Sequence, residues 1–359
     1  MKHHLDLRAA FRLAGAFIAG LIGSGFATGQ EVLQFFSSYG WKSFLALAVC
    51  LFGFLLVGHG ILRAGQEHKN DPTFQCFLFF CKKPLGTFYL ILTPIILLIF
   101  LSVMIAGAGS TIYEFFGVRR FIGSAAIAAV ALISYLIGFE KLVRIVSAIG
   151  PVMIVFLLVV GIVTIIRGSS DVDAAVQYFP VLAQSQPSRW WLISGICYIS
   201  MNFMANTQYY TQLGISAPGR REAGIAAVVG AIALILCITI TSSAILISAQ
   251  NAAQFDVPIL FMARSISPVV GLLFCFFLVL GMFSTCSTTM WTVCHHLAGR
   301  NEGRSKRIAV LVAAGTYGIS FVPFSKLVAV LYPIIGYVSI PFIFCVIFYE
   351  IKSLIKKPS

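Results

Sequence analysis

Charged side chains are scarce in this chain of 359 residues, because only 10% of them are Asp, Glu, Lys or Arg. Soluble domains carry about 25% charged residues. Hydrophobic residues make up 59% of the sequence, and the mean hydropathy is +0.96. A chain this apolar has too little polar surface for a soluble fold of its size, so we expect lipid to form part of its solvent.

The sequence also lacks the patterns of several other protein classes. Its nine cysteines are odd in number and scattered, which indicates no disulfide framework. We find no acid–base pair, nucleophile constellation or phosphate-binding loop, so we predict that the chain is not an enzyme and needs no cofactor. A net charge of +13 without a soluble basic module favours attraction to anionic membrane lipid over binding to nucleic acid.

What the sequence does contain is long apolar stretches. Ten of them are close to the length of ~20 residues that a helix needs to cross a bilayer. They lie near residues 10–38, 42–63, 85–116, 120–138, 142–167, 189–214, 221–249, 268–298, 307–323 and 326–350. Because only helices satisfy their backbone groups inside hydrocarbon, we predict an all-α membrane protein with about ten transmembrane helices.

The basic residues predict the orientation. With the N-terminus inside, seven of the 25 basic residues fall outside, and the other eighteen fall inside. The outside set is Lys42, Arg119, Arg120, Arg167, Arg189, Arg264 and Lys326. This asymmetry places both termini in the cytoplasm. The alternative interpretation of residues 1–27 as a cleaved signal peptide would remove one span and reverse the pattern.

The ten stretches divide into two sets of five. We predict a cytoplasmic N-terminus (1–9), a first five-helix repeat (10–167), an extracytoplasmic loop (168–188), a second repeat (189–350) and a cytoplasmic C-terminus (351–359). Since five is odd, the second repeat must be inverted relative to the first. Inverted repeats whose first helices are discontinuous are a recurring plan of secondary transporters, with the substrate near the bilayer midplane.

The first helix of the first repeat is predicted to be broken. Gly23 and Gly25 lower its helix propensity by about 1 kcal/mol each relative to Ala. Thr28-x-x-Glu31 then matches a capping box at the start of a new helix. Glu31 is therefore a candidate for capping, for structural pairing or for proton coupling. The alternative for the two glycines is close helix packing.

The first helix of the second repeat contains a similar polar interruption, although it has no proline or glycine at that point. We therefore predict breaks in both helices 1 and 6. The candidate substrate-binding residues are Gly23, Ser24, Gly25, Thr28, Asn202 and Asn206. We expect the backbone of Gly25 to approach a small-molecule substrate, with Asn202 or Asn206 contributing from helix 6.

In the eighth stretch, Ser284, Thr285 and Thr288 share one helical face. Hydroxyl and carbonyl oxygens suit a hard cation such as Na⁺, and these side chains would lie opposite the break. The alternative is that the hydroxyls bond to carbonyls one turn earlier in their own helix. His59, in the second stretch, is interpreted as packing against a polar partner.

Two segments carry a resemblance to a known family. "GAFIAGLIGSGFATGQEVLQFF" and "SVMIAGAGSTIYEFFG" resemble the YkvI-like family of bacterial membrane proteins, in the amino acid–polyamine–organocation transporter superfamily, and the resemblance extends over about residues 10–350. It implies the LeuT-like fold, with spans 1 and 6 packed with 3, 8 and 10 around a substrate. It also implies Na⁺ at Ser284 and Thr285, with Thr288 as a one-turn alternative.

Proton-coupled members of that superfamily often replace the sodium ion with a lysine in span five. Lys141 lies at the start of span five, too near the cytoplasmic end for that role, which favours sodium. The resemblance therefore implies cation-coupled symport of a small polar metabolite such as an amino acid. The alternative function is a non-transporting ligand sensor, like the spore-germinant receptor subunits on the same scaffold, which work with partner chains.

Overall fold

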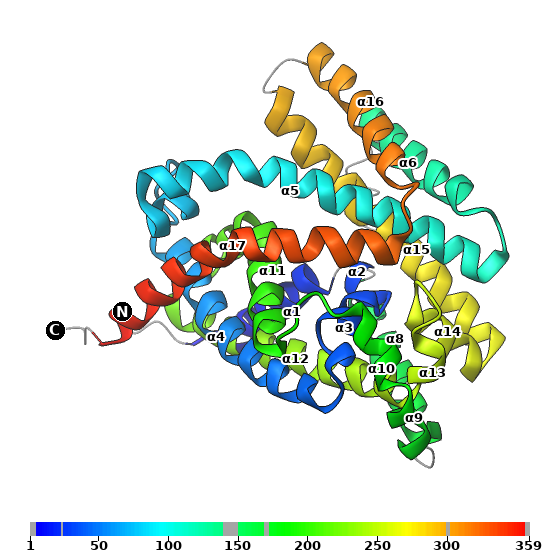
Figure 1. The fold of residues 1–359 in the computed structure, drawn as a ribbon. Helices are drawn as coiled ribbons and strands as arrows, with labels where there is room; N and C mark the ends of the chain where they lie inside the picture. The colour runs from blue at the N-terminus through cyan, green and yellow to red at the C-terminus, as the bar shows by residue number, and fades with distance from the viewer. Residues whose placement is uncertain (1–4, 23, 139–149, 169–171, 299–301, 356–359) are drawn as a thin grey trace.

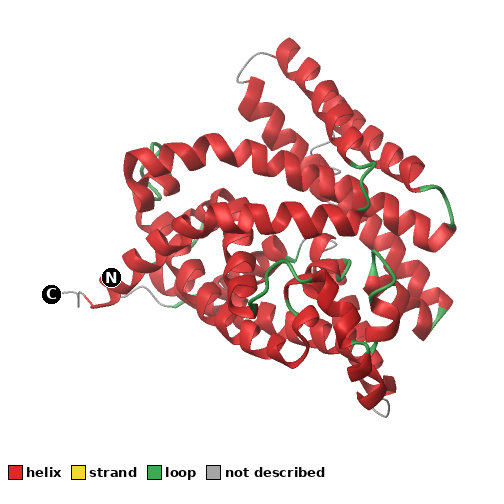
Figure 2. Ribbon diagram, viewed as in Figure 1, coloured by secondary structure: helices red, strands yellow, loops and turns green. Residues whose placement is uncertain are grey.

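The computed structural model describes residues 5–22, 24–138, 150–168, 172–298 and 302–355. These residues form α-helices and short 3-10 helices joined by turns, and no strand occurs among them (Figure 2). The prediction of an all-α fold is confirmed. Gly23 and Lys141 lie outside the described residues.

The predicted first repeat contains one broken helix followed by longer ones (Figure 1). Its elements are α1 (Leu7–Leu21), α2 (Ser24–Ala27), α3 (Gln30–Phe35), η1 (Ser37–Lys42), α4 (Ser43–Glu67), α5 (Cys76–Phe116), α6 (Arg120–Ile137) and α8 (Gly150–Gly168). The break predicted in helix 1 is confirmed, because α1, α2 and α3 are separate elements.

The predicted connecting loop contains α9 (Val172–Gln177), α10 (Phe179–Leu182) and η3 (Ala183–Ser185). The predicted second repeat contains α11 (Trp191–Ile215), α12 (Arg220–Ile247), α13 (Ala249–Ala252), α14 (Pro258–Ile266), α15 (Pro268–Ala298), α16 (Glu302–Ile319) and α17 (Phe324–Ile355). The division of the chain at the domain boundaries stays a prediction.

The second predicted break is wrong, because α11 runs as one helix through its polar residues. Their side chains bond to carbonyl oxygens one turn earlier, so they leave the helical backbone intact. Nδ2 of Asn202 donates to the Tyr198 carbonyl at 2.8 Å, and Nδ2 of Asn206 donates to the Asn202 carbonyl at 3.0 Å. Thr207 does the same with Phe203. Without glycine or proline, the backbone has no reason to unwind here.

Among the described residues, seven helical segments are long and apolar enough to cross a membrane: Ser37–Glu67, Cys76–Phe116, Arg120–Ile137, Gly150–Gly168, Arg220–Ile247, Pro268–Ala298 and Phe324–Ser353. The other three predicted spans correspond to the broken α1–α3, the polar α11, and α16, which begins with four charged residues in its first six. The count of ten spans stays a prediction.

The two halves pack in corresponding ways. α1 packs against α12, and α11, the counterpart of α1, packs against α4, the counterpart of α12. In the same way, α5 packs against α6, and α15 packs against α16. Exchanging the halves converts one set of contacts into the other, as expected for two related halves, and the inversion of one half stays a prediction.

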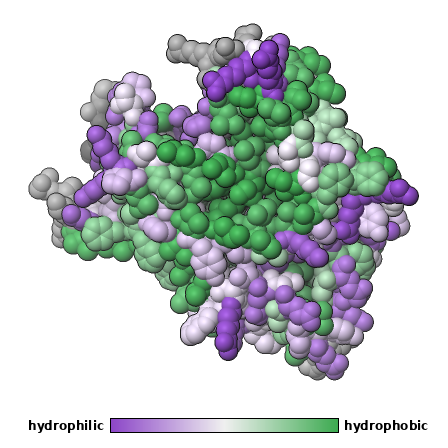
Figure 3. Space-filling model, turned by 45° about the horizontal axis from the view of Figure 1, so that its top comes forward, coloured by the Kyte–Doolittle hydropathy of each residue, from purple (hydrophilic) through white to green (hydrophobic). Residues whose placement is uncertain are grey.

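The outer surface of the molecule is largely apolar. Large hydrophobic side chains are exposed on several helices, among them Phe52 at 67%, Leu311 at 71% and Phe348 at 71%. Hydrophobic residues cover the middle of the face seen in Figure 3, and hydrophilic residues gather toward its ends. A surface of this size would be covered in a soluble protein, so lipid is its natural partner. The chain is a membrane protein.

Candidate functional site at the break of helix 1

The break exposes backbone groups that a continuous helix would pair. α1 ends at Leu21, and α2 is a single turn. Gly29 then has a φ of 85°, in the left-handed region that favours glycine, and is the N-cap of α3. The carbonyl of Thr28 leaves the helix ladder and accepts a hydrogen bond from the Ile259 amide of α14 at 3.2 Å.

Thr28 holds the turn together, but not as the predicted capping box. Its hydroxyl donates to the Gly25 carbonyl at 2.6 Å and accepts from the Gln30 amide at 3.1 Å. Gly29, and not Thr28, is the cap of α3. The expectation that Glu31 bonds back to the Thr28 amide is wrong, because that amide pairs with the Gly25 carbonyl.

The Glu31 side chain turns instead toward Gly25. A Cβ placed on Gly25 would collide with the Oε1 atom of Glu31 and would lie 2.8 Å from the Met104 methyl and 3.5 Å from the Tyr332 hydroxyl. Glu31 is 5% exposed, and no described Lys, Arg or His pairs with it. A buried carboxylate of this kind requires a proton, a cation or another donor nearby.

Several other buried polar atoms belong to α3 and to α17. The Tyr332 hydroxyl and the Oε1 atoms of Gln30 and Gln34 have no hydrogen-bond partner among the described residues. Buried polar groups are almost always paired with protein, water or ligand. These atoms therefore indicate a region built to hold something besides protein.

α11 approaches the same region. The Tyr198 phenol lies within electrostatic range of Glu31 and beside the Asn202 side chain, and the Tyr332 phenol is also within range of Glu31. Asn202 is 7% exposed, whereas Asn206 is half-buried one turn further along. The structure thus brings Asn202 toward the break through Tyr198.

α15, the helix that contains the predicted sodium residues, packs directly against α2. Ser284 is buried and Thr285 is half-buried, and the Thr285 hydroxyl donates to the Gly281 carbonyl at 3.0 Å. Thr288 is exposed, and its hydroxyl bonds to the carbonyls of Ser284 and Thr285 within α15. The hydroxyls of Thr285 and Thr288 thus make the bonds within their own helix that were the alternative interpretation, and a sodium site at Ser284, Thr285 or Thr288 stays a prediction. The side chain of Ser24 lies outside the described part of the chain.

α14 covers the break on the side of the predicted outer loops. A Cβ on Gly29 would lie 2.6 Å from the Ile259 side chain, so that side chain packs directly on the glycine. The Glu114 carboxylate accepts from the amides of Asp256 at 2.7 Å and Val257 at 3.3 Å, and thereby anchors the start of α14 to α5. Asp256 in turn accepts from Ser110.

On the opposite side, α1 packs closely against α11. The hydroxyls of Tyr209 and Tyr210 donate to the carbonyls of Ala16 at 2.8 Å and Phe17 at 3.1 Å. The rings of Phe17 and Tyr210 lie 4.7 Å apart. α11 therefore holds the last two turns of α1, just before the break.

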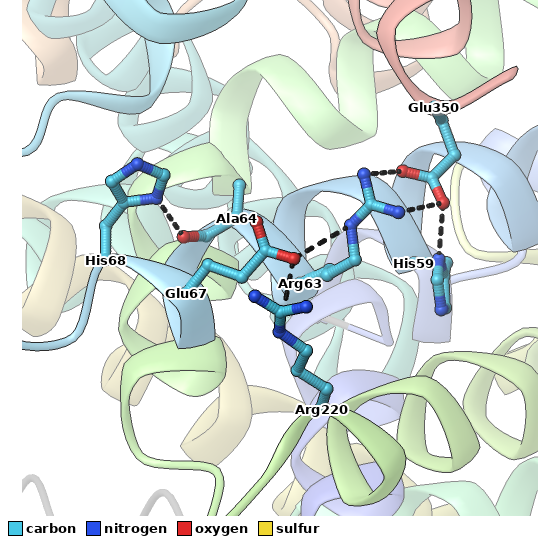
Figure 4. A network of polar contacts seen from close by, with 7 residues as sticks. All are labelled: His59, Arg63, Ala64, Glu67, His68, Arg220 and Glu350. Carbon is cyan, nitrogen blue, oxygen red and sulfur yellow. Dashed lines mark hydrogen bonds and ion pairs between the residues drawn. The ribbon is translucent and has the colours of Figure 1, made fainter. Parts of the chain in front are cut away.

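A charged network joins α4, α12 and α17 at the predicted cytoplasmic end (Figure 4). The interpretation of His59 is confirmed, because its Nδ1 lies 2.7 Å from Oε1 of Glu350, which is fully buried. Arg63 pairs with Glu350 at 3.1 Å and with Glu67 at 3.5 Å, and Arg220 pairs with Glu67 at 3.4 Å. The network links three helices whose charges would otherwise be costly to bury.

Sequence reasoning named Gly25, Glu31 and Asn202 as candidates but did not name Tyr198, Tyr332 or the two glutamines. Gln30 and Gln34 are one turn apart in an apolar stretch, which was a usable signal. The tyrosines gave no local signal, because an aromatic residue in a membrane helix is ordinary. Among the described residues, no group of three or more His, Cys, Asp or Glu is placed to hold a metal ion.

The fold and the site together define a helical membrane protein whose first helix is broken around a buried carboxylate. No protein-family model matches the chain. It is 23% identical over 337 residues to the membrane protein YkvI of Bacillus subtilis (strain 168), covering 93% of this chain and 94% of that protein. YyaD of the same organism is 22% identical over 348 residues, covering 96% of this chain and 98% of that protein. These matches over nearly the full length confirm the resemblance to the YkvI-like family.

Among solved structures, the chain is similar to an Eremococcus coleocola manganese transporter in complex with an aromatic bis-isothiourea substituted compound. That match has a TM-score of 0.46 and 13% identity, and covers 100% of this chain and 91% of the transporter. A mutant of the manganese transporter from the same organism matches with a TM-score of 0.42 and 12% identity, covering 98% of this chain and 74% of the mutant.

Proposed function

We propose that the chain is a secondary active transporter that couples the symport of a small polar metabolite to a cation gradient. The observation that carries this proposal is the Glu31 carboxylate, buried against the α-carbon of Gly25 within a break of helix 1. Broken helices in membrane proteins line ligand sites, because their unpaired amides and carbonyls need a partner. The proposal assigns no catalytic step to the chain.

The site chemistry suits an amino acid or a related compound. Backbone amides near a helix start favour a carboxylate group, and unpaired carbonyls favour an ammonium group. Tyr332, Asn202 and the Gly25 backbone would contact this substrate, with Ser24 and Thr28 shaping the turn. The packing of corresponding helices supports a five-plus-five inverted repeat around the site.

We further propose Na⁺ as the coupling ion, bound near Ser284 and Thr285 where α15 packs against α2. Hydroxyl and carbonyl oxygens are the ligands that hard cations prefer. A specific observation supports the proton as the alternative coupling ion. The Glu31 carboxylate is buried without a cationic partner among the described residues, as expected for a group that carries a proton. We place the protein in the bacterial inner membrane with both termini cytoplasmic.

The proposal is tested by a stability screen followed by a transport assay. Purified protein is heated with individual amino acids and nucleobases in Na⁺ and in K⁺, and a true ligand raises the Tm in a concentration-dependent way. The best compound, radiolabelled, is then offered to proteoliposomes with and without an inward Na⁺ gradient. Gradient-driven accumulation supports transport, whereas binding without accumulation under either a Na⁺ or a proton gradient indicates a sensor and contradicts it.

A further inference from the structure

A hollow of about 760 Å³ lies away from the break, between the first turn of α5 and the last turns of α17. These two segments lie near each other in Figure 1. The side chains that line it include Phe79, Phe80, Lys82, Phe348, Tyr349 and Lys352. It therefore combines an aromatic wall with two basic groups, and none of the described residues that line it is acidic.

The aromatic wall is ordered by ring contacts. Phe79 and Phe80 both pack against Tyr349, with ring centroids 4.9 and 5.3 Å apart. The Arg63 guanidinium lies 5.9 Å from the centre of the same Tyr349 ring. Tyr349 thus connects the hollow to the buried charged network, which makes this wall a fixed part of the fold.

The two lysines are not neutralised by the protein. Lys82 and Lys352 are exposed, and no described acidic side chain pairs with either one. The neighbouring carboxylate, Glu350, is fully buried and already paired with Arg63 and His59. The hollow therefore keeps a positive charge that is available to an anion.

Lys82 also occupies an unusual backbone position. Its φ of 59° is the one positive value outside glycine among the described residues, and its ψ is −179°. Glycine would adopt this conformation without strain, so backbone preference does not explain a lysine here. Strained residues are commonly retained where their side chains serve a function. The position favours a role for the ammonium group.

An apolar strip continues from the hollow along α17. Phe344, Phe348, Ile351 and Ile355 recur at helical spacing and are exposed by 59%, 71%, 44% and 76%. A soluble anion such as free phosphate would leave this strip uncovered. A molecule with an anionic head and long hydrocarbon chains would cover both the strip and the lysines.

We propose that this hollow binds the headgroup of an anionic phospholipid of the cytoplasmic leaflet, with the acyl chains lying along the exposed face of α17. The phosphodiester contacts Lys82 and Lys352, and the glycerol region lies against the aromatic wall. Clustered basic side chains at a membrane surface attract anionic lipid in this way. The site is separate from the substrate site at the break.

The test measures retained lipid by native mass spectrometry and Tm in mixed micelles. Protein is incubated with phosphatidylglycerol, with phosphatidylcholine, or with inorganic phosphate. The variant combines Lys82→Gly, which removes the charge and relieves the backbone, with Lys352→Gln. The matched control combines Lys42→Gln and Lys326→Gln, which removes the same charge from exposed positions on the predicted outer side.

We expect wild type and control to retain phosphatidylglycerol in preference to phosphatidylcholine. In the variant, the ratio of retained phosphatidylglycerol to phosphatidylcholine should fall about tenfold. The proposal is overturned if the variant keeps the full preference, or if inorganic phosphate displaces the lipid and gives the same stabilisation. Should the double variant fold poorly, Lys352→Gln alone carries the test, because that side chain is exposed and unpaired in the described structure.

Discussion

The Glu31 carboxylate and the Tyr332 hydroxyl converge on the α-carbon of Gly25, and the hydroxyl lies 3.5 Å from the point where a Cβ would stand. These three residues come from α3, α17 and α2, so the contact joins the break to the last helix of the chain. Glycine at this position lets two polar groups and the backbone occupy one small region. The predictions below follow from that arrangement.

Gly25→Val is expected to abolish ligand binding while the protein still folds, because the new side chain occupies the space of the Glu31 carboxylate and the Met104 methyl. The measurement is the ligand-induced rise in Tm. Gly15→Ala is the matched control, since a Cβ at this exposed position of α1 meets nothing within 4 Å. It should retain binding and gain up to about 1 kcal/mol of stability. Normal affinity in Gly25→Val would remove Gly25 from the site.

The substitution Tyr332→Phe tests whether the Tyr332 hydroxyl binds the ligand or only stabilises the fold. The hydroxyl is buried without a described partner, so its removal should leave the apo protein as stable as wild type or slightly more stable. If a substrate bonds to it, the affinity should fall about tenfold, because such a hydrogen bond contributes ~1–3 kcal/mol when its loss leaves a buried group unpaired. Calorimetric titration with the best compound from the screen measures the change. An unchanged affinity would place the substrate away from Tyr332.

The charged network predicts unequal effects for its two carboxylates. Glu350→Ala should destabilise the fold by about 3 kcal/mol or more, because Arg63 and His59 would lose a fully buried partner. Glu67→Ala should cost less than about 1 kcal/mol, because its partner Arg220 is 70% exposed and its pair with Arg63 is a long i,i+4 contact, while Arg63 keeps Glu350. Denaturant unfolding in detergent compares the two. Equal losses would show that burial does not govern the strength of this network.

The sequence predicted the break of helix 1 correctly and the break of helix 6 wrongly, because the two predictions rested on different residue types. Gly23 and Gly25 predicted the break of helix 1, because glycine acts on the backbone directly wherever it stands. The polar residues of α11 misled, since Asn202 and Thr207 bond to their own helix and leave it intact. Polar side chains of this kind occur both in broken helices and in continuous ones. Only their hydrogen-bond partners, which the sequence does not give, distinguish the two cases.

The candidate site was predictable only in part. The sequence identified Glu31 as an intramembrane carboxylate but did not predict which way its side chain points. Gly29 is the N-cap of α3, so the Glu31 side chain is not used for capping. Tyr198 and Tyr332 lie more than 160 residues from Glu31 in the sequence, and no local pattern connects them to it. Tertiary packing alone brings these phenols to the break.

The most direct test of the central proposal measures the Tm of the purified protein in Na⁺ and in K⁺ at equal ionic strength. Sodium at a hundred times its Kd should stabilise the wild type by about 2.7 kcal/mol. Thr285→Val should nearly erase the difference, whereas Glu31→Gln should keep most of it, and so should Thr292→Val, a half-buried position two turns further along α15. No difference between the two ions, together with a pH-dependent Tm that Glu31→Gln abolishes, would contradict sodium coupling and make Glu31 the proton carrier.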